Sequence, residues 1–352
     1  MIDKLISSLP KSVDGVLIIS ETNRRYFTSF PSSDGILLAT KNGSVFLTDS
    51  RYIEEAQNVV KCCEVAELRK VSEQLPELCK SLGVKVLMTE GEHLTVNQLK
   101  AYRKILKGIT VTTVGTDDLI DSLRLIKTEE ELQSVIKAQR IAEKAFDHIL
   151  GFIKEGVTER EIALELDFFM LRNGAEAISF ETIAVSGANS SKPHGVPTDK
   201  RVQSGDFITM DYGAVVNGYH SDMTRTVAVG EVSDKQAEVY DTVLEAQLRA
   251  LATLREGVKC SDVDLAARGY ITEKGYGEYF RHSTGHGVGI EIHEKPALSP
   301  KNDKKLQRGN IVTIEPGIYI PGEFGVRIED LAIITEKSCE NLTKITKELV
   351  KL

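Results

Sequence analysis

The chain lacks the features of a membrane, secreted or nucleic-acid-binding protein. No apolar run approaches the roughly 20 residues that a membrane-spanning helix needs. Residues 1–10 contain no apolar core of the length typical of a signal peptide. A formal net charge of −8 argues against a nucleic-acid surface. We therefore expect no membrane and no nucleic-acid partner.

Cysteine is scarce and irregularly placed. The five cysteines are odd in number and include no Cys-x-x-Cys pair. This pattern favours reduced thiols over a disulfide framework or a zinc site, and so predicts a cytoplasmic protein. With 41% hydrophobic and 27% charged residues, the composition is that of an ordinary globular protein. A length of 352 residues is typical of two domains.

Two nine-residue segments resemble each other. Gly205–Gly213 and Gly309–Gly317 align without a gap, and each has a glycine, an apolar alternation around a threonine, one acid and a closing glycine. The acids are Asp211 and Glu315. Because side chains alternate across a strand, each acid shares a face with the threonine two positions before it. We expect both segments to be strands.

Further ligand-type residues accompany the two strands. A second acid follows each strand in a strand-like run, Asp222 after the first and Glu329 after the second. Between the copies lies His286, flanked by glycines. A lone buried carboxylate could be satisfied by backbone donors or an arginine, but four acids and a histidine in repeated settings favour a dinuclear metal site.

The region up to residue 125 predicts an α/β domain without concentrated catalytic residue types. Apolar runs predict strands at residues 16–19, 35–39, 44–47, 84–88 and 109–114. Helices are expected over residues 51–60, 73–82 and 94–106. The polar-aromatic cluster at residues 23–27 is interpreted as a turn on a solvated edge, with docking of a partner subunit as the alternative.

Residues 126–352 predict a second domain with an internal duplication. Four capping-box patterns announce helices: Thr128 with Glu131, Thr158 with Glu161, Ser233 with Gln236, and Ser261 with Asp264. Thr128 lies 83 residues before Asp211, and Ser233 lies 82 before Glu315. Two halves packed about a pseudo-two-fold axis would bring the two pairs of acids together, with His286 completing one metal shell.

These motifs resemble the pita-bread metallopeptidases, which include methionine aminopeptidase, Xaa-Pro aminopeptidase (aminopeptidase P) and Xaa-Pro dipeptidase (prolidase). The resemblance covers nearly the whole chain. An amino-terminal α/β domain points to the Xaa-Pro branch and implies a creatinase/prolidase-type domain at 1–125 before a pita-bread domain at 126–352. The motifs are Met210–Gly213, Ser221–Thr226, Gly285–Gly289, Thr313–Gly317 and Val326–Asp330.

The resemblance implies two divalent metal ions, manganese first, with cobalt or zinc as alternatives. Oxygen-rich ligands with one imidazole suit manganese. Asp222 and Glu329 would bridge the ions, Asp211 would hold one, and His286 with Glu315 the other. A hydroxide between the metals would attack the carbonyl before proline, with Glu315 as the proton acceptor.

The resemblance also implies substrate-site roles for three histidines and an arginine. His194 and His293 would steady the carbonyl oxygen or the tetrahedral intermediate, and His282 and Arg327 would contact substrate. Alternatives stay open for each. His194 by itself suits a surface loop, and Arg327 could pair with Asp330 on a strand edge.

Neighbours of the ligands are also ambiguous. Thr209, Thr224 and Thr313 share a face with a neighbouring ligand and are candidate hydrogen-bond donors to it, although threonine favours strands in any case. His220, two residues before Asp222, could be a substrate contact, a support for a ligand or an inert neighbour.

The sequence thus predicts an Xaa-Pro metallo-exopeptidase acting on proline-containing peptides. It does not separate an aminopeptidase for longer peptides from a dipeptidase. The alternative of another class is a non-catalytic pita-bread module that binds a peptide or protein. A creatinase-like amidine hydrolase works without metals, and five intact ligands argue against it. The family implies a homodimer, which we expect to form through the amino-terminal domain.

Overall fold

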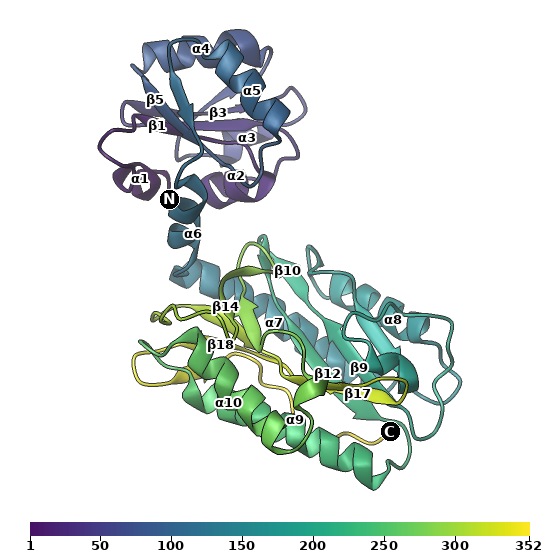
Figure 1. Ribbon diagram of the computed structural model, residues 1–352. Coiled ribbons are helices and arrows are strands. Elements are labelled where there is room, and N and C mark those ends of the chain that lie inside the picture. Colours follow the sequence, from purple (N-terminus) through teal and green to yellow (C-terminus); the bar gives the residue numbers. More distant parts are fainter. The chain divides into compact units, whose positions relative to one another are not determined.

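The chain folds into two compact units. The computed structural model describes all 352 residues, and these divide into Met1–Arg124 and Leu125–Leu352. Figure 1 shows strands and helices together in each unit. No helix in the structure combines the length and the apolar character needed to cross a membrane.

The amino-terminal unit is built on one mixed sheet. Its six strands lie in the order β4-β3-β2-β1-β5-β6, with β1 antiparallel to β2 and parallel to β5. The strands are β1 Gly15–Ile18, β2 Ile36–Thr40, β3 Gly43–Thr48, β4 Glu64–Glu67, β5 Val86–Thr89 and β6 Thr110–Thr112. The helices are α1 Ile2–Ser7, α2 Glu21–Thr28, α3 Ile53–Val59, α4 Val71–Ser81, α5 Val96–Ile105 and α6 Thr116–Arg124. The α/β class predicted for this region is confirmed.

Residues 23–27 form part of a helix, so the predicted surface turn is wrong. They lie in α2, where Asn23 and Arg24 are buried. The side chain of Asn23 donates to the buried carboxylate of Glu90 at 2.7 Å, and Arg24 donates to the carbonyl of Ser32 at 2.6 Å. Because these polar groups find partners inside the unit, the polar sequence did not mark a solvated edge.

The carboxy-terminal unit contains two halves with the same order of elements. We define the first half by α7 Glu129–Leu150, α8 Glu159–Arg172, β8 Ile183–Ser186, β9 Phe207–Tyr212 and β12 Met223–Ala228. The second half comprises α9 Asp234–Thr253, α10 Cys260–Glu273, β13 Gly285–Gly287, β15 Ile311–Ile314 and β18 Asp330–Ile334. Sheet order β12-β9-β8 in the first half matches β18-β15-β13 in the second. The predicted duplication is therefore present.

Shorter elements complete this unit. β14 lies beside β13 and β19 beside β18, while β16 pairs with β17. The remaining strands are β7 Ala177–Ile178, β10 Ala214–Val216, β11 Tyr219–His220, β14 Glu294–Leu298, β16 Gly317–Ile320, β17 Phe324–Arg327 and β19 Cys339–Asn341, with one-turn helices at Gly187–Ser191 and Gly277–Tyr279.

Each half has its own apolar core, and the central strands face both. α7 packs on α8 and α9 on α10, with strands between the two helix pairs (Figure 1). Along β9, Ile208 and Met210 enter the core of the first half, whereas Phe207 enters that of the second. The predicted alternation along this strand is confirmed, and it leaves Asp211 on the same face as Phe207.

Three of the four predicted capping boxes are confirmed. The side chains of Thr128, Thr158 and Ser233 cap α7, α8 and α9, each with its acid or glutamine three residues on. The fourth is wrong, because α10 begins two residues earlier than expected, after Lys259. Ser261 donates instead to Asp303, and Asp264 is buried.

A buried ion pair joins β12 of the first half to β18 of the second. Arg225 and Asp330 are 1% and 0% exposed, with Nη2 2.8 Å from Oδ1. Lys347 lies 2.8 Å from the other carboxylate oxygen. Burial acts to raise the pKa of Asp330, but Arg225 and Lys347 outweigh it and hold that pKa below its usual value. Arg225 also donates to the carbonyls of Thr224 and Glu329.

Substituting Arg225 by methionine should strongly destabilise the carboxy-terminal unit. Removing one partner of a buried pair leaves an uncompensated charge and costs about 3–5 kcal/mol. Urea unfolding followed by circular dichroism measures the loss. As a control, Lys235→Met breaks an exposed pair with Glu323 and should leave the midpoint near the wild-type value. Equal midpoints for the two variants would contradict the conclusion that the buried pair stabilises the unit more than the exposed pair does.

Candidate active site

Five predicted ligand residues line one cavity of the carboxy-terminal unit. Asp211 lies in β9 and His286 in β13, while Asp222 precedes β12, Glu315 follows β15 and Glu329 precedes β18. All five border a cavity of about 610 Å³. The ends of strands from both halves therefore converge on one place.

His286 faces the carboxylates without hydrogen-bonding to them. Its Nε2 lies 3.5 Å from Asp222 Oδ2 and 3.6 Å from Glu315 Oε1. Its Nδ1 donates to the carbonyl of Gly287 at 3.0 Å, because a carbonyl only accepts. Burial lowers the pKa of His286 to about 4. The ring is therefore neutral, and Nε2 presents a lone pair to the carboxylates, as a metal ligand does.

The glycines around His286 let its strand fit between two others. A Cβ at Gly285 would lie 1.9 Å from the carbonyl oxygen of Thr313, and one at Gly287 would lie 2.3 Å from that of Lys295. Only glycine allows such close backbone approach. The Gly-His-Gly sequence thus holds the imidazole at a fixed depth in the cavity.

The carboxylates raise one another's pKa. Burial, followed by the charge of Glu329, raises the pKa of Asp222 well above its usual value. The pKa of Glu329 is also raised well above its usual value, by burial and by the charges of Asp211 and Glu315. Burial also raises the pKa of Glu315 to about 8. Clustered acids of this kind need protons or a cation to remain together.

The residues fit a divalent cation. Ligand atoms of Asp222, His286 and Glu329 lie within 4.8 Å of one another. Asp211 Oδ1 is buried and has no hydrogen-bond partner, although Oδ2 accepts from Arg327 at 2.6 Å. An unpaired buried oxygen beside other carboxylates is what a bound cation would satisfy. Oxygen donors with one imidazole suit manganese or a similar ion.

Two of the three candidate threonines lie beside the acids. Thr224 donates to Glu329 at 2.7 Å. Thr313 lies 3.5 Å from Glu315 and accepts from the backbone of His286 at 3.1 Å. Thr209 faces Thr226 instead, so that hydroxyl touches none of the five residues.

The three predicted substrate histidines border the same cavity. His194, His282 and His293 line it together with Arg327 and with an apolar wall that includes Phe180, Ile183, Val196, Pro197 and Ile292. The rings of His286 and His293 meet edge to face with centroids 4.4 Å apart. Burial, with the charge of Arg327, lowers the pKa of His282 to about 4, which leaves that ring neutral.

Arg327 is held by groups inside the site. Its guanidinium donates to Asp211 at 2.6 Å and to the Tyr319 hydroxyl at 2.7 Å. The alternative pairing with Asp330 is wrong, because Arg225 takes that position. Burial acts to lower the pKa of Arg327, but Tyr319 and Asp211 are among the groups that raise it well above its usual value.

Tyr319 is a site residue that the sequence analysis missed. Its hydroxyl joins Arg327 to His282 Nε2, the latter at 3.0 Å. A signal was available, because Tyr319 shares a strand face with Gly317. A Cβ at Gly317 would lie 2.5 Å from the tyrosine hydroxyl, so this glycine makes room for the phenol.

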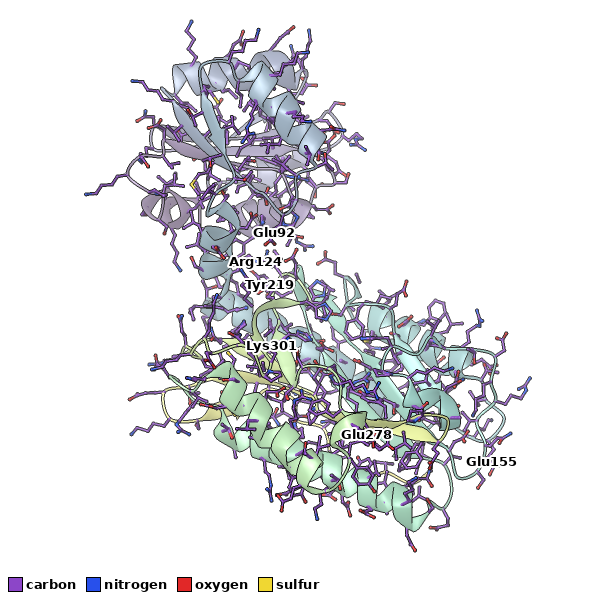
Figure 2. All side chains as sticks on the ribbon, in the orientation of Figure 1. Glu92, Arg124, Glu155, Tyr219, Glu278 and Lys301 are labelled. Atoms are coloured by element: carbon purple, nitrogen blue, oxygen red, sulfur yellow. The ribbon has the colours of Figure 1, made fainter.

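His220 is not among the residues that line the cavity. Its Nδ1 lies 2.8 Å from the Ser179 hydroxyl, and its backbone amide donates to Gly289 at 2.9 Å. The neighbouring Tyr219, labelled in Figure 2, donates to Glu131 at 2.8 Å. These contacts tie the β10–β11 hairpin to α7 and to the segment after His286.

The sequence matches two family models along most of its length. Residues 133–336 match metallopeptidase family M24, and residues 3–126 match the creatinase/prolidase N-terminal domain. The chain belongs to metallopeptidase family M24. The predicted architecture, an α/β domain before a pita-bread domain, is thereby confirmed, and the protein is an enzyme of a family that depends on divalent metal ions.

Relatives resemble this M24 metallopeptidase over their full length. A structure titled as an Xaa-Pro dipeptidase from Bacillus anthracis has 44% identity and a TM-score of 0.96, covering 100% of this chain and 99% of that one. An X-Pro aminopeptidase structure from Thermotoga maritima has 36% identity and a TM-score of 0.93, with 100% and 99% covered. An Xaa-Pro dipeptidase of Pyrococcus horikoshii is 39% identical, with 99% and 98% covered.

A divalent metal should raise the unfolding temperature of the metal-stripped enzyme. Ligand at 100 times its Kd stabilises a protein by about 2.7 kcal/mol. Asp222→Asn removes a carboxylate whose pKa is raised by burial and by the neighbouring carboxylates. We therefore expect this variant to unfold at a higher temperature than the wild type without metal, and to gain little when metal is added. Calorimetry with and without Mn²⁺ tests both. The exposed control Glu278→Gln, at a site labelled in Figure 2, should follow the wild type.

The metal-free enzyme should lose stability as the pH rises. The pKa of Glu315 goes from an ordinary 4.5 to about 8 on folding. An acid with a raised folded pKa binds more protons when folded, so its stabilising effect is complete below the unfolded pKa and is lost as pH rises through the folded one. Urea unfolding from about pH 4.5 to about pH 8 measures the slope. Glu315→Gln should reduce the slope of stability against pH. An unchanged slope would show that Glu315 does not cause the pH dependence.

Proposed function

We propose that this enzyme hydrolyses the bond between an amino-terminal residue and a following proline. The observation that carries the proposal is one cavity lined by four histidines, Arg327 and the clustered acids Asp211, Asp222, Glu315 and Glu329. Relatives whose names are Xaa-Pro dipeptidase and X-Pro aminopeptidase support the same reaction. The substrate would be a dipeptide or a longer peptide with proline in second place.

We propose that Asp211, Asp222, His286, Glu315 and Glu329 hold two divalent ions, manganese first, with cobalt or zinc as alternatives. Support comes from the unpaired oxygen of Asp211 and from the pKa values of Asp222 and Glu329, which burial and neighbouring carboxylates raise. When bound, such ions lower the pKa of water far enough to make hydroxide available near neutral pH.

Glu315 is the residue to which we assign proton transfer. Burial in the metal-free cavity raises its pKa to about 8. A carboxylate that readily accepts a proton from the attacking water can return it to the prolyl nitrogen as that nitrogen leaves. Thr313 Oγ1 lies 3.5 Å from this carboxylate.

The histidines supply orientation and hydrogen bonds. His194 and His293 would steady the carbonyl oxygen as negative charge develops on it. His282, neutral because its pKa is about 4, and Arg327 would contact the remainder of the substrate. The apolar wall around Ile292 suits a proline ring, which has no N–H that would need a partner there.

The cellular setting is part of the proposal. The five cysteines are free thiols, which supports an enzyme of the cytoplasm. We further propose that residues 1–125 and 126–352 are the two domains and that a homodimer forms through the first of them. Analytical ultracentrifugation of the full chain tests the dimer.

Metal-stripped enzyme should regain cleavage of Ala-Pro or Ala-Pro-Ala when Mn²⁺, Co²⁺ or Zn²⁺ is restored. Cleavage of the dipeptide alone would make it a dipeptidase, and cleavage of the tripeptide an aminopeptidase. Glu315→Gln should lower kcat by about 10²-fold or more, the usual contribution of a proton-transfer group. His148→Ala, which alters a histidine paired with Glu165 outside the cavity lining, should leave kcat unchanged. A folded, metal-loaded enzyme that cleaves neither peptide would contradict the proposal and favour a peptide-binding module.

A further inference from the structure

A buried carboxylate without a cation lies behind the segment that carries His194. Glu159 is the first residue of α8 and is 0% exposed. It forms no ion pair, and burying an isolated carboxylate is costly unless hydrogen bonds compensate. Its position at a helix amino terminus supplies only part of that compensation. The rest comes from one loop.

Three residues of this loop donate to Glu159. Oε1 accepts from the amide and hydroxyl of Ser186 at 2.7 and 3.0 Å, and from the side chain of Asn189 at 3.1 Å. Oε2 accepts from the amide and hydroxyl of Thr198 at 3.0 and 2.6 Å. Ser186 and Thr198 lie on opposite sides of His194 in sequence. One carboxylate therefore fastens both ends of the loop.

The inner side of the same loop rests on β17. Ser190 accepts from the backbone amide of Gly325 at 2.9 Å, and Arg327 donates to the carbonyl of Pro193 at 3.3 Å. Val196, two residues before Thr198, is 72% exposed and lines the cavity with His194. The His194 segment is therefore held at Glu159 and at β17, while part of it stays open to solvent beside the cavity.

The second half uses the same device for His282. Asp264, on α10 and 1% exposed, accepts from the amide and hydroxyl of Thr284 at 3.2 and 2.8 Å. It also pairs with Arg268, which donates to the carbonyl of His282 at 2.7 Å. A buried acid near the start of the second helix thus supports a substrate histidine in each half.

We propose that Glu159 is a positioning residue for His194, an inference that rests on the proposed function. An acid that only capped α8 would sit in solvent, as Glu161 does in the same first turn, where it accepts from the amide and hydroxyl of Thr158 at 2.8 Å each. Glu159 instead orders the loop so that the imidazole is already placed when substrate arrives, and this preorganisation lowers the cost of reaching the transition state.

Glu159→Gln tests the proposal, with Glu161→Gln as the matched control at the same helix terminus. The amide presents a donor to groups that already donate, so we expect kcat on the cleaved proline peptide to fall by about 10-fold or more, with KM changed less. Glu161→Gln should stay within about two-fold of the wild type. In a His194→Ala background, Glu159→Gln should cause little further loss.

Two measurements keep the test decisive if Glu159→Gln folds poorly or the wild type cleaves nothing. Ser186→Ala and Thr198→Val each remove one hydroxyl donor and should lower kcat in smaller steps. In histidine-labelled, metal-free protein, the NMR signal of His194, assigned by its loss in His194→Ala, should shift or broaden in Glu159→Gln and stay in place in Glu161→Gln. An unmoved signal, or an equal loss of kcat with and without His194, would overturn the positioning role. Absent cleavage with a moved signal would overturn only the proposed function.

Discussion

The structure of this M24 metallopeptidase depends on holding four carboxylates close together in one cavity. Burial and the charges of neighbouring carboxylates raise the pKa values of Asp222, Glu315 and Glu329 in this cavity, which Asp211 also lines. Arg327 neutralises one of them and Thr224 donates to another. These two partners do not balance all of the negative charge in the cavity, and a divalent cation would balance the remainder. The same charge concentration that opposes folding without metal makes the site a strong cation ligand.

Polar groups around the cavity hold these mutually repelling carboxylates in position. Behind the ligands, Arg225 and Asp330 join β12 to β18, and Arg225 also contacts the carbonyl of Glu329. Behind the histidines, Glu159 and Asp264 hold the segments of His194 and His282. Each buried acid is satisfied by several donors, so the polar interior adds specificity as well as stability. The site is positioned by buried polar contacts that lie behind the cavity.

Much of the site was predictable because its signal is local and repeated. The copies that contain Asp211 and Glu315 have a two-residue period that assigns each acid to a strand face, and three capping boxes mark the starts of α7, α8 and α9. Tyr319 was missed because its partners, Arg327 and His282, lie on other segments. Likewise, α2 was missed because its polar residues bond to a distant Glu90.

The sequence by itself determined the α/β class, the duplication and the kinds of residue available for catalysis, since periodicity, caps and motif spacing act over a few residues. Tertiary structure alone decided which charges meet. Arg327 pairs with Asp211 rather than Asp330, Thr209 contacts Thr226 rather than a ligand, and Asp264 turns inward instead of capping α10. Each of these outcomes is set by competition among partners distant in sequence. The observed partner is the group whose hydrogen bonds best offset the cost of its burial, and these bonds depend on how the two halves pack.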